Sequence, residues 1–194
     1  MMYMARQRKI IIEDLLKATE ELLLEKGYEG FHFKALSEKL DVARSTIYEY
    51  YSNKDELITD YMRLLMMEVM GRIKAIKERP SSFQMLKELL NLFMEYSQVY
   101  DMIKMRPSLN QSGSPAVIKN LQDLDCSSQE LFKLLSVHIE RAKAEGSIRE
   151  DLSTSLVAGI FFNTVLIPNH EKIPPAQWSE MIFSLIEHGI SSKK

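Results

Sequence analysis

The segment from residue 33 to residue 57 limits the possible folds most, because two short helical patterns meet there across a very tight connection. Apolar spacing predicts one helix over about 33–40 and another over about 44–51, with only residues 41–43 between them. Neither helix can bury its apolar side alone, so each needs cover from the other and from the flanking helices. Five residues face inward by spacing: Leu36, Leu40, Val42, Ile47 and Tyr51. The segment therefore predicts a helix-turn-helix.

The rest of the chain repeats the helical spacing of apolar residues and contains no credible strand pairs. Only seven Gly and six Pro occur in 194 residues, which favours long helices over a turn-rich β fold. Further helices are expected over about 8–25, 54–78, 82–104, 125–145, 156–167 and 176–190, with loops at 107–115 and 168–175. We predict an all-α fold of about nine helices.

Two helix boundaries have a specific chemical signal. Gly27 follows the first helical stripe and is expected to end it, because a positive φ costs glycine little. Before the long helix at 54–78, either Ser52 with Asp55 or Asn53 with Glu56 fits a capping box. Both alternatives predict a helix that begins directly after the helix-turn-helix.

Composition argues against catalytic, metal and membrane roles. Cys126 is the only cysteine, so neither a disulfide nor a cysteine metal cage can form within one chain, and the four histidines have no partner at ligand spacing. We therefore expect no catalytic residues, no metal, no cofactor and no enzymatic activity. No run of about 18 uncharged apolar residues occurs, and Glu13 and Asp14 interrupt the first Ile run, so a membrane span and a signal peptide are not expected. A cytoplasmic protein fits this pattern.

Bulk charge gives no support for nucleic-acid binding. The net charge is −2, and residues 1–54 hold nine Lys or Arg against nine Asp or Glu. Any affinity for DNA must therefore come from the placement of individual side chains.

The second short helix of the helix-turn-helix presents such a placement. Hydrogen-bonding side chains are expected on its outward side: Arg44, Ser45, Thr46, Tyr48 and Tyr50. A short polar rod fits the major groove, where base edges show a distinct donor and acceptor pattern. Lys54 begins the next helix, where backbone N–H groups and the ammonium would both favour a phosphate. Packing between helices is the alternative role for the tyrosines, above all for Tyr51.

The run from Leu36 to Leu57 resembles the signature of the TetR (tetracycline-repressor) family of transcriptional regulators, and the resemblance extends over about residues 8–60. The matching positions are Leu36, Val42, Thr46, Ile47, Tyr48, Tyr50, Tyr51, Lys54 and Leu57. The resemblance implies phosphate contacts for Lys34, Tyr48, Tyr50 and Lys54. It implies contacts with base edges or backbone for Arg44, Ser45 and Thr46. It also implies a DNA-binding domain over residues 1–53 and a ligand-binding and dimerisation domain over residues 54–194.

Four residues depart from the family pattern. Asp41 replaces the usual turn glycine, although Asp tolerates the left-handed region better than most residues. Ala43 and His32 stand where hydroxyl side chains commonly cap the two short helices, and a lost cap costs about 1 kcal/mol. Glu49 replaces a frequent aromatic or His and would repel a phosphate.

The C-terminal part is rich in methionine and aromatic residues, eight of the twelve methionines lying between residues 62 and 105. Methionine adapts to irregular shapes, so a roomy apolar interior that accepts an apolar or aromatic ligand is one interpretation, and simple core packing is the other. The candidate ligand-binding residues are Met66, Met70, Phe93, Tyr96, Tyr100, His138 and Phe162. For His138 the alternative is a partly buried polar residue.

The last two helical segments are candidates for a dimer interface, because residues 156–167 are apolar nearly all round. The candidate interface residues are Leu156, Gly159, Ile160, Asn163, Trp178, Ile182, Leu185 and Ile186. The resemblance implies a four-helix bundle between two subunits, which would place two recognition helices on successive major grooves of a palindromic operator.

These features predict a ligand-responsive DNA-binding regulator, with double-stranded operator DNA, a small-molecule effector and a second copy of the chain as partners. Repression relieved by a mainly apolar effector is the default, and activation or corepression stays open. The rival interpretation is a helical small-molecule-binding module whose helix-turn-helix is purely structural, and an enzyme is a distant third.

Overall fold

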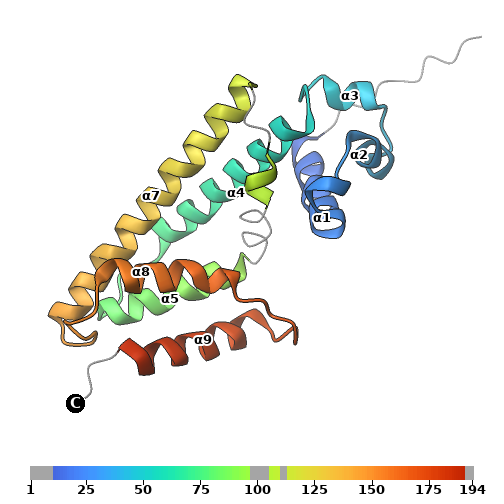
Figure 1. Ribbon diagram of the computed structural model, residues 1–194. Coiled ribbons are helices and arrows are strands. Elements are labelled where there is room, and N and C mark those ends of the chain that lie inside the picture. Colours follow the sequence, from blue (N-terminus) through green and yellow to red (C-terminus); the bar gives the residue numbers. More distant parts are fainter. Residues whose placement is uncertain (1–10, 97–104, 110–112, 191–194) are drawn as a thin grey trace, which may run out of the picture. The chain divides into compact units, whose positions relative to one another are not determined.

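The computed structural model describes residues 11–96, 105–109 and 113–190, and every regular element in these ranges is a helix (Figure 1). The α-helices are α1 (Ile12–Gly30), α2 (Phe33–Leu40), α3 (Arg44–Tyr48), α4 (Lys54–Ala75), α5 (Ser82–Glu95), α7 (Pro115–Ala144), α8 (Thr154–Asn163) and α9 (Pro175–Ile190). Two 3₁₀ turns, η1 (Arg106–Ser108) and η2 (Thr164–Leu166), complete the set. The predicted all-α fold is confirmed.

The described residues group into two compact units. Those up to Leu65, together with those from Met105 to Leu124, form the first unit, and the remaining ones form the second. Both α4 and α7 contribute residues to each unit. The predicted domain boundary after residue 53 concerns function and stays a prediction.

The core of the first unit follows the predicted inward pattern of the helix-turn-helix. Leu15 from α1, Leu36 from α2, Ile47 from α3 and Leu57 from α4 are fully buried. Burying such a side chain contributes about 1.5–3 kcal/mol, so this core stabilises the two short helices α2 and α3, which could not persist alone.

The second unit is built around α5, which packs against α9. Phe83 and Phe183 meet with ring centroids 5.2 Å apart, and Leu86, Leu89 and Leu90 on α5 are fully buried. None of the helices within the described ranges is both long and apolar enough to span a bilayer.

Several helix boundaries differ from the sequence-based prediction. The helix predicted over 125–145 begins at Pro115, because proline fits the first helical turn, where no N–H is needed. The helix expected to reach residue 78 ends at Ala75, and the apolar segment 156–167 changes to a 3₁₀ turn after Asn163. The helix predicted over 82–104 ends at Glu95, and residues 97–104 lie outside the described ranges.

Gly27 interrupts α1, as its sequence position predicts. Its φ of 64° and ψ of −177° break the helical path, after which one further turn runs to Gly30. Glycine adopts this backbone without the steric cost that a Cβ would bring.

Candidate functional sites

The turn of the helix-turn-helix is closed by a left-handed residue. Asp41 has φ 53° and ψ 48°, and the N–H of Val42 donates to the Ser37 carbonyl at 3.1 Å. The expectation that Asp41 accepts this conformation in place of glycine is confirmed. Ala43 and His32 precede α3 and α2 without a side-chain capping bond to any described residue.

The exposed face of α3 is made by Arg44, Ser45 and Tyr48. Arg44 and Tyr48 are four residues apart and so share one side of the helix, and Tyr48 is 55% exposed. Ile47 points the other way and is fully buried. The outward side of α3 is therefore polar and exposed, and the apolar side chain of Ile47 anchors its inward side.

Thr46 corrects the sequence-based placement. We expected it on the outward side of α3, and that placement is wrong, because its side chain is only 3% exposed. A helix of five residues turns by 100° per residue, so Thr46 shares the inner half with its neighbour Ile47.

The Tyr48 ring packs against the ring of Phe33, a residue that the sequence analysis had not assigned to the site. The Phe33 and Tyr48 rings meet edge to face, with centroids 5.0 Å apart and planes at 67°. Phe33 is buried at the start of α2, so this contact limits the orientations of the Tyr48 ring. The only signal in the sequence was an aromatic residue at each end of the helix-turn-helix.

The remaining candidate DNA contacts differ in exposure. The Lys34 side chain is 67% exposed and lies 4.0 Å from Glu38 one turn later, a contact that water screens strongly. Tyr50 is half-buried just beyond α3, where its N–H donates to the Ile47 carbonyl at 3.0 Å.

Lys54 is half-buried at the N-terminus of α4 and is engaged with Tyr28 near the end of α1. Its ammonium donates to the Tyr28 carbonyl at 3.0 Å and lies 3.9 Å from the Tyr28 ring centroid. The Tyr28 hydroxyl donates to Asp55 at 2.7 Å. Burial and this carboxylate raise the pKa of Tyr28, so the phenol stays protonated. Tyr28 therefore positions Lys54, a role that the sequence did not reveal.

The cap of α4 confirms the second of the two predicted alternatives. The Asn53 side chain accepts from the N–H of Glu56 at 2.9 Å, and the Glu56 carboxylate accepts from the N–H of Ser52 at 3.0 Å. The same carboxylate accepts a short hydrogen bond from Ser114, just before α7. These bonds, with that from Ser114 the strongest, lower the pKa of Glu56.

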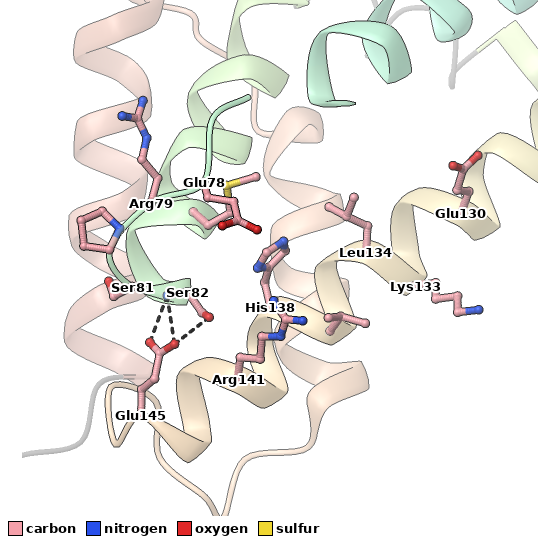
Figure 2. A pocket seen from close by; sticks show the side chains of 13 residues that line it. Glu78, Arg79, Ser81, Ser82, Glu130, Lys133, Leu134, His138, Arg141 and Glu145 are labelled. Atoms are coloured by element: carbon pink, nitrogen blue, oxygen red, sulfur yellow. Dashed lines mark hydrogen bonds between the residues drawn. The ribbon is translucent and has the colours of Figure 1, made fainter. Parts of the chain in front are cut away.

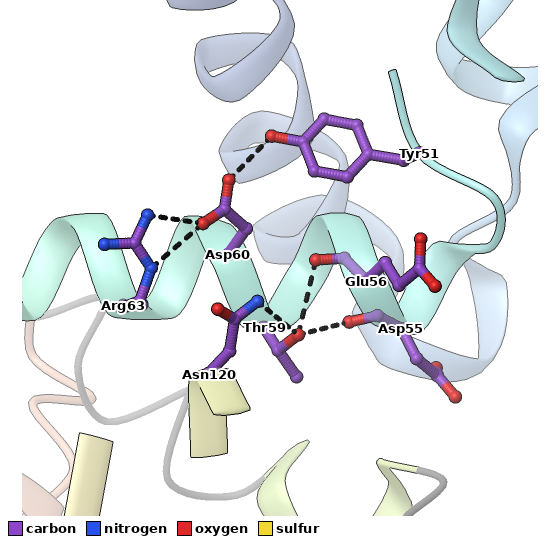
Figure 3. A network of polar contacts seen from close by, with 7 residues as sticks. All are labelled: Tyr51, Asp55, Glu56, Thr59, Asp60, Arg63 and Asn120. Carbon is purple, nitrogen blue, oxygen red and sulfur yellow. Dashed lines mark hydrogen bonds and ion pairs between the residues drawn. The ribbon is translucent and has the colours of Figure 1, made fainter. Parts of the chain in front are cut away.

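A polar network on α4 anchors the chain that leaves α3 (Figure 3). The Tyr51 hydroxyl donates to Asp60 at 2.8 Å, and the Arg63 guanidinium holds the same carboxylate at 2.6 Å. Burial, followed by the Asp60 interaction, raises the pKa of Tyr51. At the preceding residue of α4, the Thr59 hydroxyl accepts from Asn120 of α7 at 3.2 Å. Tyr51 is therefore a half-buried residue that is fixed at its hydroxyl.

The candidate ligand-binding residues differ in burial. Met70, Phe93 and Tyr96 are buried, and the Tyr96 hydroxyl donates to Glu68 at 2.8 Å. Met66, His138 and Phe162 are half-buried, and Tyr100 lies outside the described residues. A cavity of about 590 Å³ includes His138 in its lining but none of the other candidates (Figure 2). Their role as a ligand-binding set stays a prediction.

The candidate interface residues on α8 and α9 divide into exposed and buried members. Leu156, Ile160 and Leu185 are 55%, 40% and 77% exposed, and we call these three residues the α8–α9 stripe. They line an apolar groove of about 310 Å³. Ile182 and Ile186 are buried, Gly159 and Trp178 are half-buried, and the exposed Asn163 amide donates to the Gly159 carbonyl at 2.7 Å.

Within the described ranges, no three His, Cys, Asp or Glu side chains lie close enough together to hold a metal ion. Cys126 is exposed on α7.

Comparison with known proteins gives the same family as the sequence signature. Residues 15–61 match the family model of bacterial regulatory proteins of the tetR family. An uncharacterised helix-turn-helix transcriptional regulator of Haemophilus influenzae is 27% identical over 139 residues, which are 68% of this chain and 74% of that protein.

Solved structures share the fold over nearly the whole chain. The ketosteroid transcriptional regulator KstR2 of Mycobacterium tuberculosis has a TM-score of 0.79 at 13% identity and covers 97% of this chain and all of its own. The transcriptional regulator FadR of Bacillus subtilis, solved with stearoyl-CoA, has a TM-score of 0.69 at 20% identity and covers 93% of this chain and all of its own. The helix-turn-helix thus matches the tetR family model over residues 15–61, and the whole chain shares the fold of these transcriptional regulators.

Proposed function

We propose that the protein is a homodimeric repressor that binds a palindromic operator and is released by a small, mainly apolar effector. The observation that carries this proposal is the outer face of α3, where Arg44, Ser45 and Tyr48 are exposed above the buried Ile47. Polar side chains on a rigid rod suit base edges and phosphates in the major groove.

The proposed DNA contacts follow the observed exposure. Arg44 and Ser45 meet base edges or backbone, and Tyr48 and Lys34 meet phosphates. Tyr50 and Lys54 add phosphate contacts through the parts of their side chains that remain accessible, whereas Thr46 supports the helix from inside. Such a regulator acts where the DNA is, in the cytoplasm, and needs neither a cofactor nor a catalytic group.

Dimerisation through α8 and α9 is proposed because the α8–α9 stripe leaves large apolar side chains in water. A second copy would cover the same residues on both subunits, as a two-fold axis requires. The symmetric pair would then present two copies of α3 to two half-sites.

The proposed response to the effector runs along α4. Its first turn is tied to the helix-turn-helix through Lys54 and Tyr28, whereas Val69, Met70 and Ile73 near its other end are buried in the second unit. An effector that prefers one position of α4 would change the spacing of the recognition helices and so weaken DNA binding. The apolar character of the effector is supported by the Met and aromatic content of that unit, and FadR of Bacillus subtilis, which shares the fold, was solved with stearoyl-CoA, a ligand with a long apolar acyl chain.

Fluorescence anisotropy with labelled DNA that flanks the gene tests this proposal. We expect specific, salt-dependent binding, and Lys34→Ala should flatten the dependence of log K on log salt by about one unit. Lys77→Ala is the matched control, because Lys77 is exposed in the second unit. Binding that is indifferent to sequence, or equal slopes for both variants, would favour the rival interpretation of a ligand-binding module with a structural helix-turn-helix.

A further inference from the structure

A cavity of about 590 Å³ in the second unit lies outside the proposed DNA and dimer surfaces (Figure 2). Its walls are the connection between α4 and α5, the first turn of α5 and one face of α7. Four apolar side chains contribute to the lining: Pro80, Met85, Leu134 and Val137. Its volume is in the range of small-molecule sites, and its mixed lining suits an amphipathic ligand.

Part of the charge around the cavity is already neutralised within the walls. The Glu145 carboxylate accepts from the N–H and the hydroxyl of Ser82 at 3.0 and 2.8 Å, which ties the end of α7 to the start of α5. Arg79 lies 2.9 Å from Glu88, and Glu130 lies 3.1 Å from Lys74. The two ion pairs have little charge left for a ligand, whereas Glu145 keeps its negative charge because its partner Ser82 is neutral.

Two cations of the lining lack an ion pair within the described chain. Lys133 and Arg141 are exposed residues of α7 that line the cavity, and neither side chain forms an ion pair or a hydrogen bond with any residue that the structure describes. Glu78 and Glu145 are the two acidic lining residues without an ion pair among the described residues. The charges without an ion pair therefore balance in number, so attraction for an anion depends on the position of Arg141 beside His138 and not on net charge.

His138 supplies an unmet hydrogen-bonding atom in the same wall. Its Nδ1 is shielded from water and has no partner among the described residues. Figure 2 shows His138 and Arg141 projecting from α7 toward the connection between α4 and α5. A buried polar atom without a partner is unfavourable, and a ligand oxygen or a bound water would provide the missing hydrogen bond.

We infer that this cavity binds the anionic group of an amphipathic effector, a carboxylate or a phosphate, at Arg141 with His138 as a hydrogen-bonding partner. The guanidinium can hold either anion through two parallel N–H bonds. Met85, Leu134 and Val137 would cover the adjoining apolar part of the ligand. The inference rests on the proposed function, since it names the chemical class of the proposed effector.

Isothermal titration of the full chain without DNA tests the inference with three probes: decanoate, decyl phosphate and decanol. We expect at least one anionic probe to bind about tenfold or more tightly than decanol, because a charge-assisted hydrogen bond contributes to its affinity alone. Arg141→Gln should abolish this preference. Arg149→Gln should keep it, because Arg149 is exposed, pairs with Asp151 at 2.5 Å and does not line the cavity. The tighter of the two anions identifies the headgroup.

Nitrogen-15 NMR of the histidine side chains locates the bound probe. The His138 resonances should move on titration with the anionic probe in wild type. The inference is overturned if neither anion binds, if decanol binds as tightly as the better anion, if Arg141→Gln leaves the preference intact, or if the His138 resonances do not move.

Release of DNA is measured separately by anisotropy. Binding of the anion without release of a bound operator overturns the identification of the cavity as the effector site. A protein that binds the anion but no DNA would contradict the proposed function and leave the cavity assignment standing.

Discussion

The outer face of α3 and the α8–α9 stripe are both exposed, but they expose opposite chemistry. Arg44, Ser45 and Tyr48 offer charge and hydrogen bonds to solvent, whereas Leu156, Ile160 and Leu185 offer hydrocarbon. Water satisfies the first face at little cost, but it hydrates the second unfavourably. The contrast shows why one face suits a charged polymer and the other suits a second copy of the same face.

Leu185→Arg should have the largest effect, because Leu185 is the most exposed member of the stripe, at 77%. A charge at the centre of an apolar interface should weaken the dimer about 100-fold or more, and weaken operator binding with it. Light scattering across a concentration series measures the oligomeric state. Leu24→Arg is the control, because Leu24 is a 52% exposed leucine on α1. If the Leu185→Arg chain stays dimeric, the dimer interface does not lie on the α8–α9 stripe.

Tyr48 variants separate hydrogen bonding from packing on the opposite face. Tyr48→Phe keeps the ring against Phe33, so we expect a modest loss of operator affinity from the missing hydroxyl. Tyr48→Ala removes both and should weaken binding about tenfold, within the 1–3 kcal/mol range of a good contact. Anisotropy at fixed salt gives the affinities. Equal affinity for all three proteins would remove Tyr48 from the DNA interface.

Ala43→Ser should stabilise the helix-turn-helix. Ala43 has the extended backbone of an N-cap, with φ −68° and ψ 144°, but has no side chain that can cap α3. A serine hydroxyl there should raise the free energy of unfolding by about 1 kcal/mol. Urea denaturation followed by circular dichroism measures the change. No gain would mean that the first N–H groups of α3 already have other partners.

The smallest effect concerns pH. Burial, and then the charge of Arg141, hold the pKa of His138 below its ordinary value of 6.5, against an opposing influence of Glu145. His138 therefore binds a proton near pH 6.5 in the unfolded chain, but only at lower pH in the folded chain. The neutral His138 should therefore contribute fully to the free energy of unfolding above pH 6.5. The free energy of unfolding should decrease as the pH falls from 6.5 toward the pKa of His138 in the folded chain. His138→Gln should show a shallower acid-side slope in urea titrations, and an unchanged slope would contradict the shift.

The sequence predicted short-range features well where a single residue type enforces them. The break at Gly27, the left-handed Asp41 and the Asn53–Glu56 cap were all expected, because each depends on neighbours within a few residues. The helix beginning at Pro115 was placed about ten residues too late, because polar residues such as Gln122 and Asp123 obscured its apolar stripe.

Side-chain environments were harder to predict, because they depend on contacts between distant segments. Thr46 was expected outside and is buried, since a five-residue helix gives the periodicity too little length to fix its phase. Tyr28 positions Lys54, and Phe33 positions Tyr48. No pattern among neighbouring residues predicted either contact.

By itself, the sequence determined the helical class, the helix-turn-helix and its resemblance to the TetR family, because helical periodicity and turn chemistry depend on residues close together in the chain. Only the tertiary structure decided which candidate side chains reach solvent, and that Lys133, His138 and Arg141 line a cavity together with residues of the α4–α5 connection. Burial and unpaired charge arise from residues far apart along the chain, so they appear only when the helices pack.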